Sequence, residues 1–386
     1  MKKNLVALIL IAALLLSTVQ AVAVQQPTLP LSAASALLME KESGQVLYEQ
    51  NSQEQMEPAS VTKIMTLLLI MEALQEQRIH KEDMVTISAH AAGMGGSQVY
   101  LEQGEQMSVH ELVKCITVVS GNDAAVAMAE YLAGSEEVFV EQMNQRALEL
   151  GMVNTHFVNC TGLPVEGHVT TAYDIALMSR ELILHHPEIQ EYTTIWMDSI
   201  RNGAFGLTNT NRLIHSYQGA TGLKTGSTDS ALYCMSATAE RDGMELIAVI
   251  MKAPTSADRF QDAQKLLDYG FASYRLQEVY PDQPFAPIPV HLGTQDYIQP
   301  QLEKTCKVLI KNGQEESVTK TVTVQNEVSA PIAQGESIGT FQVYVDGILY
   351  EEIPIVSTQS VDKITIFGIY LSLLQQLLLC GNNSYN

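Results

Sequence analysis

Apolar residues recur at helical spacing in several stretches of this chain. Residues 60–74 carry them at intervals of three and four, which predicts a helix. The S-x-x-E pattern at residues 108–111 is a capping box and predicts a helix that runs through Val118. The T-x-x-D pattern at residues 171–174 predicts another helix start, and a further helix is expected over residues 257–271.

Shorter apolar runs separated by turn residues predict strands. Residues 37–39 and 46–48 flank a Ser-Gly turn, which predicts a β-hairpin at the start of the globular region. Residues 232–239 and 246–252 flank an Arg-Asp-Gly turn and predict a second antiparallel pair, covered by the helix over residues 257–271. Helices and antiparallel strands in one region indicate an α/β (α+β) domain.

The character of the sequence changes at a proline-rich stretch. Four prolines fall between residues 281 and 289, which indicates a linker. Beyond it, residues 317–324 and 340–345 alternate as strands do, and helix signals are few. We therefore predict a larger domain over residues 24–278 and a small β-rich domain over residues 279–360.

Residues 1–23 have the pattern of a secretory signal peptide. Two lysines precede an apolar run of 12 residues, 5–16, and Ala21 and Ala23 are small residues suited to cleavage. The alternative is an uncleaved anchor, but the run is shorter than the about 20 apolar residues that a membrane span needs. The prediction is therefore a protein that works outside the cytoplasmic membrane.

The last segment, residues 361–386, contains a second apolar stretch at residues 364–380. Polar residues interrupt it, and its length is marginal for crossing a bilayer. A helix lying in the membrane interface fits this pattern better, and a helix packed on the protein's own surface is the alternative. The residues expected to face lipid are Ile366, Tyr370, Leu373, Leu374 and Leu377.

Charge and composition exclude several function classes. With 22 Lys and Arg against 43 Asp and Glu, the formal net charge is −21, which argues against a nucleic-acid partner. The chain of 386 residues has 9 His and 5 Cys but no metal-binding motif built from them. The cysteines lie far apart in apolar stretches, so buried free thiols are expected. No metal or organic cofactor is predicted.

The first candidate for catalysis is Ser60-Val61-Thr62-Lys63, at the start of a predicted helix. Residues three apart share a helix face, so the Lys63 amine can reach the Ser60 hydroxyl and remove its proton. The helix N-terminus adds backbone N–H groups where an oxyanion would form. The same four letters recur at residues 317–320, but within a predicted strand, where residues three apart point to opposite faces. We therefore predict that this second copy does not form a catalytic serine–lysine pair.

Two further short motifs gain meaning from the first. Ser120-Gly121-Asn122 lies between two predicted helices and can point a hydroxyl and an amide into a cleft. Lys224-Thr225-Gly226 precedes the second strand pair, where an edge can pair with an extended peptide and the glycine permits close backbone approach. Each motif alone could be an ordinary turn.

In this order, S-x-x-K, S-x-N and K-T-G form the set used by penicillin-binding proteins and serine β-lactamases. Over residues 30–275 the chain resembles the low-molecular-mass D-alanyl-D-alanine carboxypeptidases, and the matching segments include Asn154-Thr155-His156-Phe157. The resemblance implies a DD-peptidase fold with an antiparallel sheet and a helical subdomain. It also implies trimming of the terminal D-alanine from peptidoglycan stem peptides and covalent inhibition by β-lactams. The β-rich domain and the membrane-binding tail are familiar in that family.

The resemblance also implies roles for individual residues. Ser60 would form the acyl-enzyme, Lys63 would be the general base, and Ser120 would relay a proton to the leaving D-alanine. Asn122 would position the substrate amide. Lys224 would lend positive charge to Ser120 and to the substrate carboxylate, and Arg259 would assist in binding that carboxylate. Thr225 and Gly226 would belong to the same substrate-binding segment, and the N–H groups of Ser60 and Ser227 would form the oxyanion hole. Some members carry His where this chain has Ser227, which bears on specificity.

Other readings of the same motifs remain open at this stage. A class A β-lactamase needs a deacylating Glu, usually within E-x-x-L-N, and no such stretch lies between Asn122 and Lys224. A non-catalytic protein with this fold is a second alternative, and endopeptidase action on cross-links is a third. His168, the pair His185-His186 and Asp123 are expected to be structural.

Overall fold

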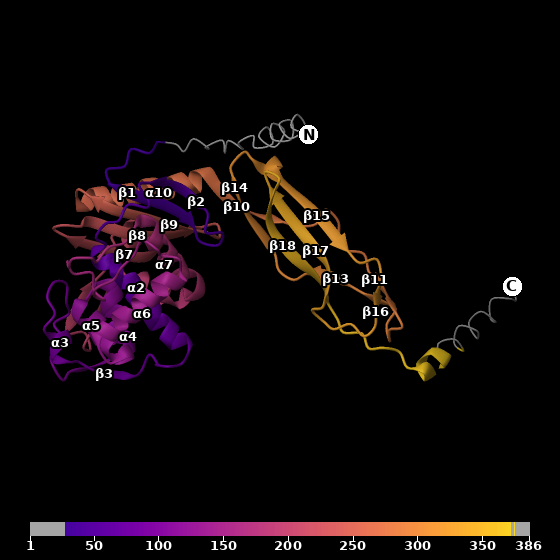
Figure 1. Ribbon diagram of the computed structural model, residues 1–386, viewed down its shortest axis with the longest axis horizontal. Helices are drawn as coiled ribbons and strands as arrows, with labels where there is room; N and C mark the ends of the chain where they lie inside the picture. The colour runs from indigo at the N-terminus through magenta and orange to yellow at the C-terminus, as the bar shows by residue number, and fades with distance from the viewer. Residues whose placement is uncertain (1–27, 372–373, 375–386) are drawn as a thin grey trace, which may run out of the picture.

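The computed structural model describes residues 28–371 and 374, so the predicted signal peptide lies outside the described residues. Figure 1 shows a larger body of helices and strands beside an elongated body of strands. No helix in the described part of the chain is both long and apolar enough to cross a membrane.

The larger body combines one sheet with most of the helices. The helices of the larger body are η1 (Ala59–Thr62), α2 (Lys63–Gln75), α3 (Ala89–Ala92), α4 (Val109–Val118), α5 (Asn122–Ala133), α6 (Glu136–Glu149), α7 (Ala172–His185), η2 (Pro187–Ile189), α8 (Gln190–Thr193), α9 (Leu213–Ser216) and α10 (Ser256–Ser273), and a further short helix, η3 (Glu315–Ser317), lies in the second body. The strands of the larger body are β1 (Ser35–Glu40), β2 (Val46–Gln50), β3 (Met84–Thr86), β4 (Gln106–Ser108), β5 (Met197–Ile200), β6 (Phe205–Thr208), β7 (Ala220–Thr228), β8 (Leu232–Arg241) and β9 (Met244–Ala253).

Its central sheet has five strands in the order β2-β1-β9-β8-β7, and every neighbouring pair is antiparallel. Successive residues of a strand face opposite sides of the sheet, so each strand contributes side chains to two hydrophobic cores. In β1, Leu37 and Met39 join the cluster around α2, whereas Leu38 joins the cluster beneath α10. Helix α10 therefore covers one face of the sheet, and α2 with α7 covers the other.

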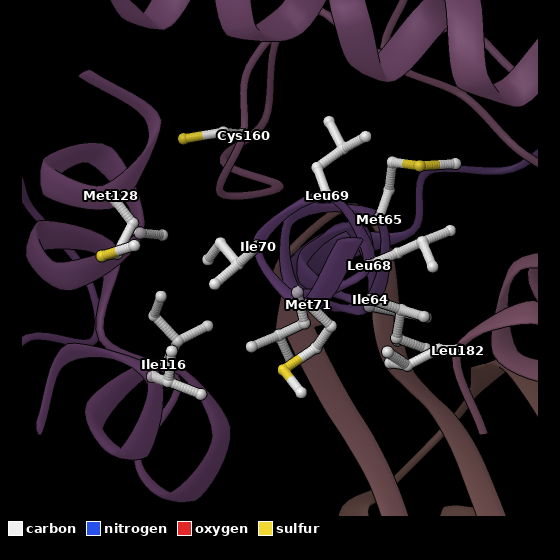
Figure 2. Packing of buried hydrophobic residues seen from close by; sticks show 14 of the residues in the cluster. Ile64, Met65, Leu68, Leu69, Ile70, Met71, Ile116, Met128, Cys160 and Leu182 are labelled. Atoms are coloured by element: carbon white, nitrogen blue, oxygen red, sulfur yellow. The ribbon is translucent and has the colours of Figure 1, made fainter. Parts of the chain in front are cut away.

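Helix α2 is the centre of the helical region. Every residue from Lys63 to Met71 is buried, because α4, α5, α6, α7 and the sheet surround it. Figure 2 shows its apolar side chains pointing outward in all directions, toward Ile116, Met128 and Leu182. A helix buried on all sides holds its N-terminus in a fixed position.

The local predictions of the sequence are confirmed. Ser108 caps α4 by accepting a hydrogen bond from the Glu111 N–H, and Thr171 caps α7 in the same way through Asp174. Both predicted strand pairs form as antiparallel neighbours, and α10 lies over them. The four cysteines of the described part are free and buried, as expected, and Cys380 lies outside it: Cys115, Cys160, Cys234 and Cys306.

The second body is β-rich, as predicted. A four-stranded sheet has the order β13-β18-β17-β15, and a three-stranded one has the order β12-β11-β16. The strands are β10 (Tyr274–Val279), β11 (Ile288–His291), β12 (Tyr297–Ile298), β13 (Pro300–Leu302), β14 (Cys306–Lys311), β15 (Val318–Val324), β16 (Val328–Ser329), β17 (Ser337–Val345) and β18 (Ile348–Ser357).

The two bodies are joined by the ribbon of β10 and β14. These strands pair along their whole length, so the boundary predicted between residues 278 and 279 falls inside β10. Alternate residues of β14 face different cores: Leu309 packs in the cluster beneath α10, whereas Val308 and Ile310 pack in the core of the second body. A strand buried on both faces fixes the two bodies to each other.

The described part of the tail begins a short helix at residues 366–371. Ile366 is 89% exposed, Phe367 69% and Tyr370 60%, so these apolar side chains do not pack on the protein's own surface. Leu374 is 37% exposed, whereas Leu373 and Leu377 lie outside the described residues. The described part of the tail therefore presents several apolar side chains to its surroundings.

Candidate active site

Three segments that are distant in the sequence meet at the N-terminal end of α2. Ser60 lies in η1, directly before Lys63 at the start of α2. The loop between α4 and α5 carries Ser120, and Asn122 begins α5. Strand β7, at the edge of the sheet, carries the Lys-Thr-Gly motif and packs against η1. The structure thus brings together the three motifs found in the sequence.

The first motif forms the serine–lysine contact that its spacing predicts. The Lys63 amine lies 2.9 Å from the Ser60 hydroxyl oxygen and donates a hydrogen bond to it. The contact forms because η1 continues into α2 as one helical segment, which places side chains three residues apart on one side. Thr62 secures the turn by donating its hydroxyl hydrogen to the Ala59 carbonyl at 2.9 Å.

The Lys63 amine is fully buried and surrounded by acceptors. Besides Ser60, it donates to the Asn122 side-chain oxygen at 2.6 Å and to the Thr161 carbonyl at 2.7 Å. Burial lowers the pKa of Lys63 from 10.5 to about 7, against a smaller raising effect of Cys160 and Asp123. A substantial fraction of Lys63 is therefore a neutral amine near neutral pH, as a base must be.

Ser120 holds an unusual backbone conformation next to this pair. Its φ of 65° lies in the left-handed region, where residues other than glycine are uncommon. The side chain is only 4% exposed, yet its hydroxyl oxygen has no hydrogen-bond partner among the described residues. A strained residue with an unsatisfied buried hydroxyl is a feature typical of functional sites.

Both polar atoms of the Asn122 amide make hydrogen bonds within the protein. Its oxygen accepts from Lys63, and its nitrogen donates to the Gly95 carbonyl at 2.7 Å. The resemblance implies that Asn122 positions the substrate, and the structure shows that Asn122 also holds the Lys63 amine. Asp123 supports the neighbouring loop, because its carboxylate accepts from the backbone N–H groups of Val99 and Leu101.

The third motif lies along β7. Lys224 is 1% exposed and donates only to the neighbouring Thr225 carbonyl, at 2.9 Å, among its hydrogen bonds within the described residues. Burial, helped by Lys63 and Arg259, holds the pKa of Lys224 well below its ordinary value. The Thr225 hydroxyl donates to Thr210 at 2.8 Å. An arriving anion would restore the charged form of Lys224.

Gly226 is the point where β7 touches the nucleophile segment. A Cβ atom at this position would lie 2.8 Å from the Ser60 backbone nitrogen and 2.9 Å from that of Val61. Both neighbours are main-chain atoms, so no side chain can move aside. Gly226 therefore lets β7 approach the Ser60 segment itself, whereas the sequence linked this glycine to the approach of a substrate backbone; Ser227 follows it as an exposed residue.

Arg259 lies behind β7 at the start of α10. Its guanidinium donates to the Gly226 carbonyl at 3.1 Å and to the Cys234 carbonyl at 3.4 Å, and the rings of Tyr233 and Phe260 flank it. Burial lowers the pKa of Arg259 from 12.5 to about 10. Arg259 therefore stabilises the end of the motif strand from inside the protein.

The loop of residues 159–163 is a part of the site that the motif analysis missed. It supplies the Thr161 carbonyl, the third acceptor of the Lys63 amine. A backbone carbonyl can come from any residue type, so no letter in the sequence marks it. The sequence could have indicated a turn here, because Asn159 and Gly162 are residue types that favour turns. Gly162 has a φ of 83°, which favours glycine.

The histidines predicted to be structural take no part in the serine–lysine contact. His168 is buried, its ring bridges the Thr62 hydroxyl and the Val158 N–H, and burial lowers its pKa to about 4. His186 is buried near Glu188, and His185 lies beside Glu181. Within residues 28–371 and 374, no three His, Cys, Asp or Glu side chains gather in a way that could hold a metal ion.

The arrangement is suited to acyl transfer. A partly exposed hydroxyl contacts a buried amine whose pKa is near neutrality, which is how a serine nucleophile is activated. The first turn of a helix lies beside that hydroxyl and can offer N–H groups to an oxyanion. Two further buried basic side chains, Lys224 and Arg259, and the unpaired Ser120 hydroxyl could serve a carboxylate and a leaving group.

Known proteins share both halves of this chain. The family described as D-alanyl-D-alanine carboxypeptidase matches residues 20–255, and the penicillin-binding protein 5 C-terminal domain matches residues 274–363. The D-alanyl-D-alanine carboxypeptidase DacF of Bacillus subtilis is 44% identical over 336 residues, covering 86% of each chain. DacC of Escherichia coli is 35% identical over 341 residues, covering 86% of this chain and 85% of its own.

Solved structures agree with these similarities. Penicillin-binding protein 5 from Haemophilus influenzae superposes with a TM-score of 0.71 at 29% identity, covering 87% of this chain and 99% of its own. Penicillin-binding protein D2 from Listeria monocytogenes, in its ampicillin-bound form, has a TM-score of 0.59 at 38% identity, covering 64% of this chain and 100% of its own. The family match spans more than half of the chain, and relatives above 30% identity cover most of it. This chain therefore belongs to the D-alanyl-D-alanine carboxypeptidase family of serine peptidases.

Proposed function

We propose that this protein removes the terminal D-alanine from peptidoglycan stem peptides that end in D-Ala-D-Ala, through an acyl-enzyme on Ser60. The observation that carries the proposal is the 2.9 Å contact between the Ser60 hydroxyl and a fully buried Lys63 amine. Family membership supplies the substrate class, since the relatives are named for this activity.

In the acylation step, the Ser60 oxygen attacks the carbonyl carbon of the scissile D-Ala-D-Ala bond. The neutral Lys63 amine takes the hydroxyl proton, and the carbonyl oxygen becomes an oxyanion. The backbone N–H groups of Ser60 and Ser227 are assigned to that oxyanion, supported by the close packing of Gly226 on the Ser60 segment. The tetrahedral intermediate then loses the terminal D-alanine.

The leaving nitrogen needs a proton, which we assign to a relay from Lys63 through Ser120. The free Ser120 hydroxyl supports this role, because a relay must exchange its hydrogen bonds during the step. The terminal carboxylate of the substrate is assigned to Lys224 and Thr225, with Arg259 as an auxiliary. Asn122 would contact the substrate amide while it holds Lys63 in place.

In the deacylation step, a water molecule attacks the Ser60 ester, and Ser60 leaves with its proton restored. The same residues would attack the strained amide of a β-lactam, in agreement with the ampicillin-bound form of the Listeria relative. A β-lactamase is the alternative reading. The hydrogen-bond partners of Lys63 in the described residues are a hydroxyl, an amide and a backbone carbonyl, with no carboxylate among them. Slow loss of the penicilloyl group is therefore expected.

The exposed tail residues support attachment to a membrane surface outside the cytoplasm. Ile366, Phe367 and Tyr370 offer an apolar face that the protein itself does not cover. The paired strands β10 and β14 would then hold the catalytic body at a fixed distance from that surface, with the β-rich body as a stalk. We expect the tail to lie in the interface.

The proposal is tested by incubating the purified protein with a peptide ending in D-Ala-D-Ala and measuring the D-alanine released. We expect release by the wild type and none by Ser60→Ala, and a benzylpenicillin adduct that persists for many minutes. Rapid consumption of penicillin with no lasting adduct would identify a β-lactamase. No release and no adduct would identify a non-catalytic protein. Comparing linear and cross-linked muropeptides separates carboxypeptidase from endopeptidase action.

A further inference from the structure

The geometry around Lys63 requires a partner that the three motifs do not contain. A neutral amine has two N–H groups and one lone pair. The Asn122 oxygen at 2.6 Å and the Thr161 carbonyl at 2.7 Å accept two of its hydrogens. The third polar contact of the nitrogen is the Ser60 hydroxyl, 2.9 Å away: the ammonium form donates a hydrogen bond to it, and the neutral amine turns its lone pair to it. The direction of the lone pair therefore depends on the Thr161 carbonyl.

The Thr161 carbonyl is held in turn by the side chain of Asn159. The Asn159 oxygen accepts three hydrogen bonds, from the Thr161 N–H at 3.1 Å, the Thr161 hydroxyl at 3.1 Å and the Gly162 N–H at 2.7 Å. The Asn159 nitrogen donates to the Leu163 carbonyl at 2.9 Å. One side chain thus closes the whole turn from residue 159 to residue 163.

Separate contacts fix the surroundings of this turn. The Cys160 N–H donates to Glu136, and the Cys160 carbonyl accepts from Thr66 of α2 at 2.7 Å. Figure 2 shows Cys160 among the buried side chains around α2. Gly162 packs against η1, where a Cβ atom would lie 1.9 Å from the Ala59 carbonyl oxygen. The turn therefore lies tightly against the nucleophile segment, and small changes in it reach Lys63.

We propose that Asn159 is a positioning residue for the reaction: it holds the turn that aims the Thr161 carbonyl at the Lys63 amine, and so directs that amine at Ser60. This inference rests on the proposed function, because it assigns Asn159 a part in activating Ser60. Asn159 does not touch Ser60 or Lys63 in any hydrogen bond, so its effect passes through the backbone of Thr161.

The Thr161 carbonyl also affects the protonation of Lys63. A purely structural role of Asn159 would leave the pH dependence of acylation unchanged, so this dependence distinguishes the two roles. An acceptor stabilises the ammonium form, so loss of the Thr161 contact lowers the pKa of Lys63 further. The other groups that face Lys63 are Asp123 from α5, Cys160 from the turn, Lys224 from β7 and His168. Asp123, Lys224 and His168 lie outside the turn that Asn159 closes, whereas Cys160 belongs to it.

The test compares two asparagines whose side chains hold the same stretch of main chain. Asn144 of α6 holds it two residues before the turn, by accepting from the Phe157 N–H and donating to the Phe157 carbonyl, both at 2.8 Å. Asn159→Ala and Asn144→Ala each remove a half-buried amide that fixes main-chain groups of residues 157–163. Only the first releases the Thr161 carbonyl, so Asn144→Ala is the matched control.

The measured quantity is the second-order rate of acylation by benzylpenicillin as a function of pH. Asn159→Ala is expected to lower the plateau rate about 10- to 100-fold, as small misplacements of a catalytic group do. It should also move the acid limb of the profile to lower pH. Asn144→Ala should leave the limb where it is in the wild type. Asn159→Asp keeps the three-fold acceptor, so it should recover much of the rate, with the limb unchanged or at higher pH.

Equal profiles for Asn159→Ala and Asn144→Ala would overturn the inference, as would an unchanged limb in Asn159→Ala. Thermal unfolding of each variant shows whether a low rate comes from an unfolded population. A failure of the proposed function itself looks different, since the wild type would then form no adduct at any pH.

Discussion

The chain contains the letters Ser-Val-Thr-Lys twice, and the two copies behave differently. In the first, the helical turn directs the Lys63 amine to Ser60 and buries it completely. In the second, Ser317 ends a short 3-10 turn and Lys320 lies in β15, on an exposed strand. The Lys320 amine donates to the Tyr280 carbonyl at 2.7 Å, and the Ser317 hydroxyl donates to the Gln314 carbonyl. Identical letters thus give a reactive pair in one place and two separate surface contacts in the other.

The difference lies in the secondary structure and in burial. A helix brings residues three apart together, whereas a strand sends them to opposite faces. Burial then removes water from Lys63 and lowers its pKa to about 7. Lys320 keeps a solvent-accessible ion pair with Asp282, which is itself 82% exposed. A motif of this kind becomes a site only where the fold buries its base.

The largest expected effect comes from replacing the buried lysine. Lys63→Met keeps the length of the side chain but removes the base, so acylation by benzylpenicillin should fall at least about 100- to 10,000-fold. Lys320→Met is the matched control and should acylate at the wild-type rate. Both rates are measured by intact mass. Equal loss in the two variants would mean that the second copy also takes part.

Gly226→Ala should have the next largest effect. The new Cβ atom would lie 2.8 Å from the Ser60 backbone nitrogen, so either η1 or β7 must shift. We expect acylation to slow by about 100-fold, because misplacement of the nucleophile by about 1 Å has effects of that size. Gly206→Ala in β6 is the control, since nothing lies within 4 Å of its Cβ position. A Gly226→Ala enzyme with normal rates would contradict the close packing described here.

Replacing Lys63 should raise the stability of the protein while it lowers the activity. The folded-state pKa of about 7 lies below the ordinary value of 10.5, so the unfolded chain binds more protons between these values. The burial of Lys63 therefore reduces the free energy of unfolding. This reduction is complete below pH 7 and becomes smaller as the pH rises toward 10.5. Lys63→Met should unfold at a higher temperature than the wild type near neutral pH, with a gap that narrows in alkaline solution. A lower unfolding temperature would refute the assigned burial penalty.

The smallest effect is expected at the exposed copy. Lys320→Ala removes a surface ion pair with Asp282, and such pairs contribute at most about 1 kcal/mol. Denaturant unfolding should show a change of that size or less, and D-alanine release should be unaffected. A large loss of stability would mean that β15 depends on Lys320 in a way that its contacts do not indicate.

The sequence predicted the features whose causes are local. The three-residue spacing within a helix predicted the Ser60–Lys63 contact, and the capping-box residues predicted where α4 and α7 begin. The alternation in residues 317–324 correctly predicted a strand over most of the second Ser-Val-Thr-Lys copy, but β15 begins at Val318 and Ser317 lies in the preceding 3-10 turn.

Features set by distant contacts could not be predicted in the same way. The Thr161 carbonyl meets Lys63 across 98 residues, and main-chain atoms carry no sequence signal. The resemblance assigned Asn122 to the substrate, but its contact with Lys63 depends on how α5 packs beside α2. The pairing of β10 with β14, which moves a strand across the predicted domain boundary, has the same kind of cause.

We expect burial to make Lys63 a base that works near neutral pH. The measurement that decides this is the rate of Ser60 acylation by benzylpenicillin, taken on the wild-type protein across the pH range in which it stays folded. The expected result is a rate that rises about tenfold per pH unit up to a pH of about 7 and then levels off. A rate that keeps rising toward pH 10.5, the ordinary pKa of lysine, would contradict it.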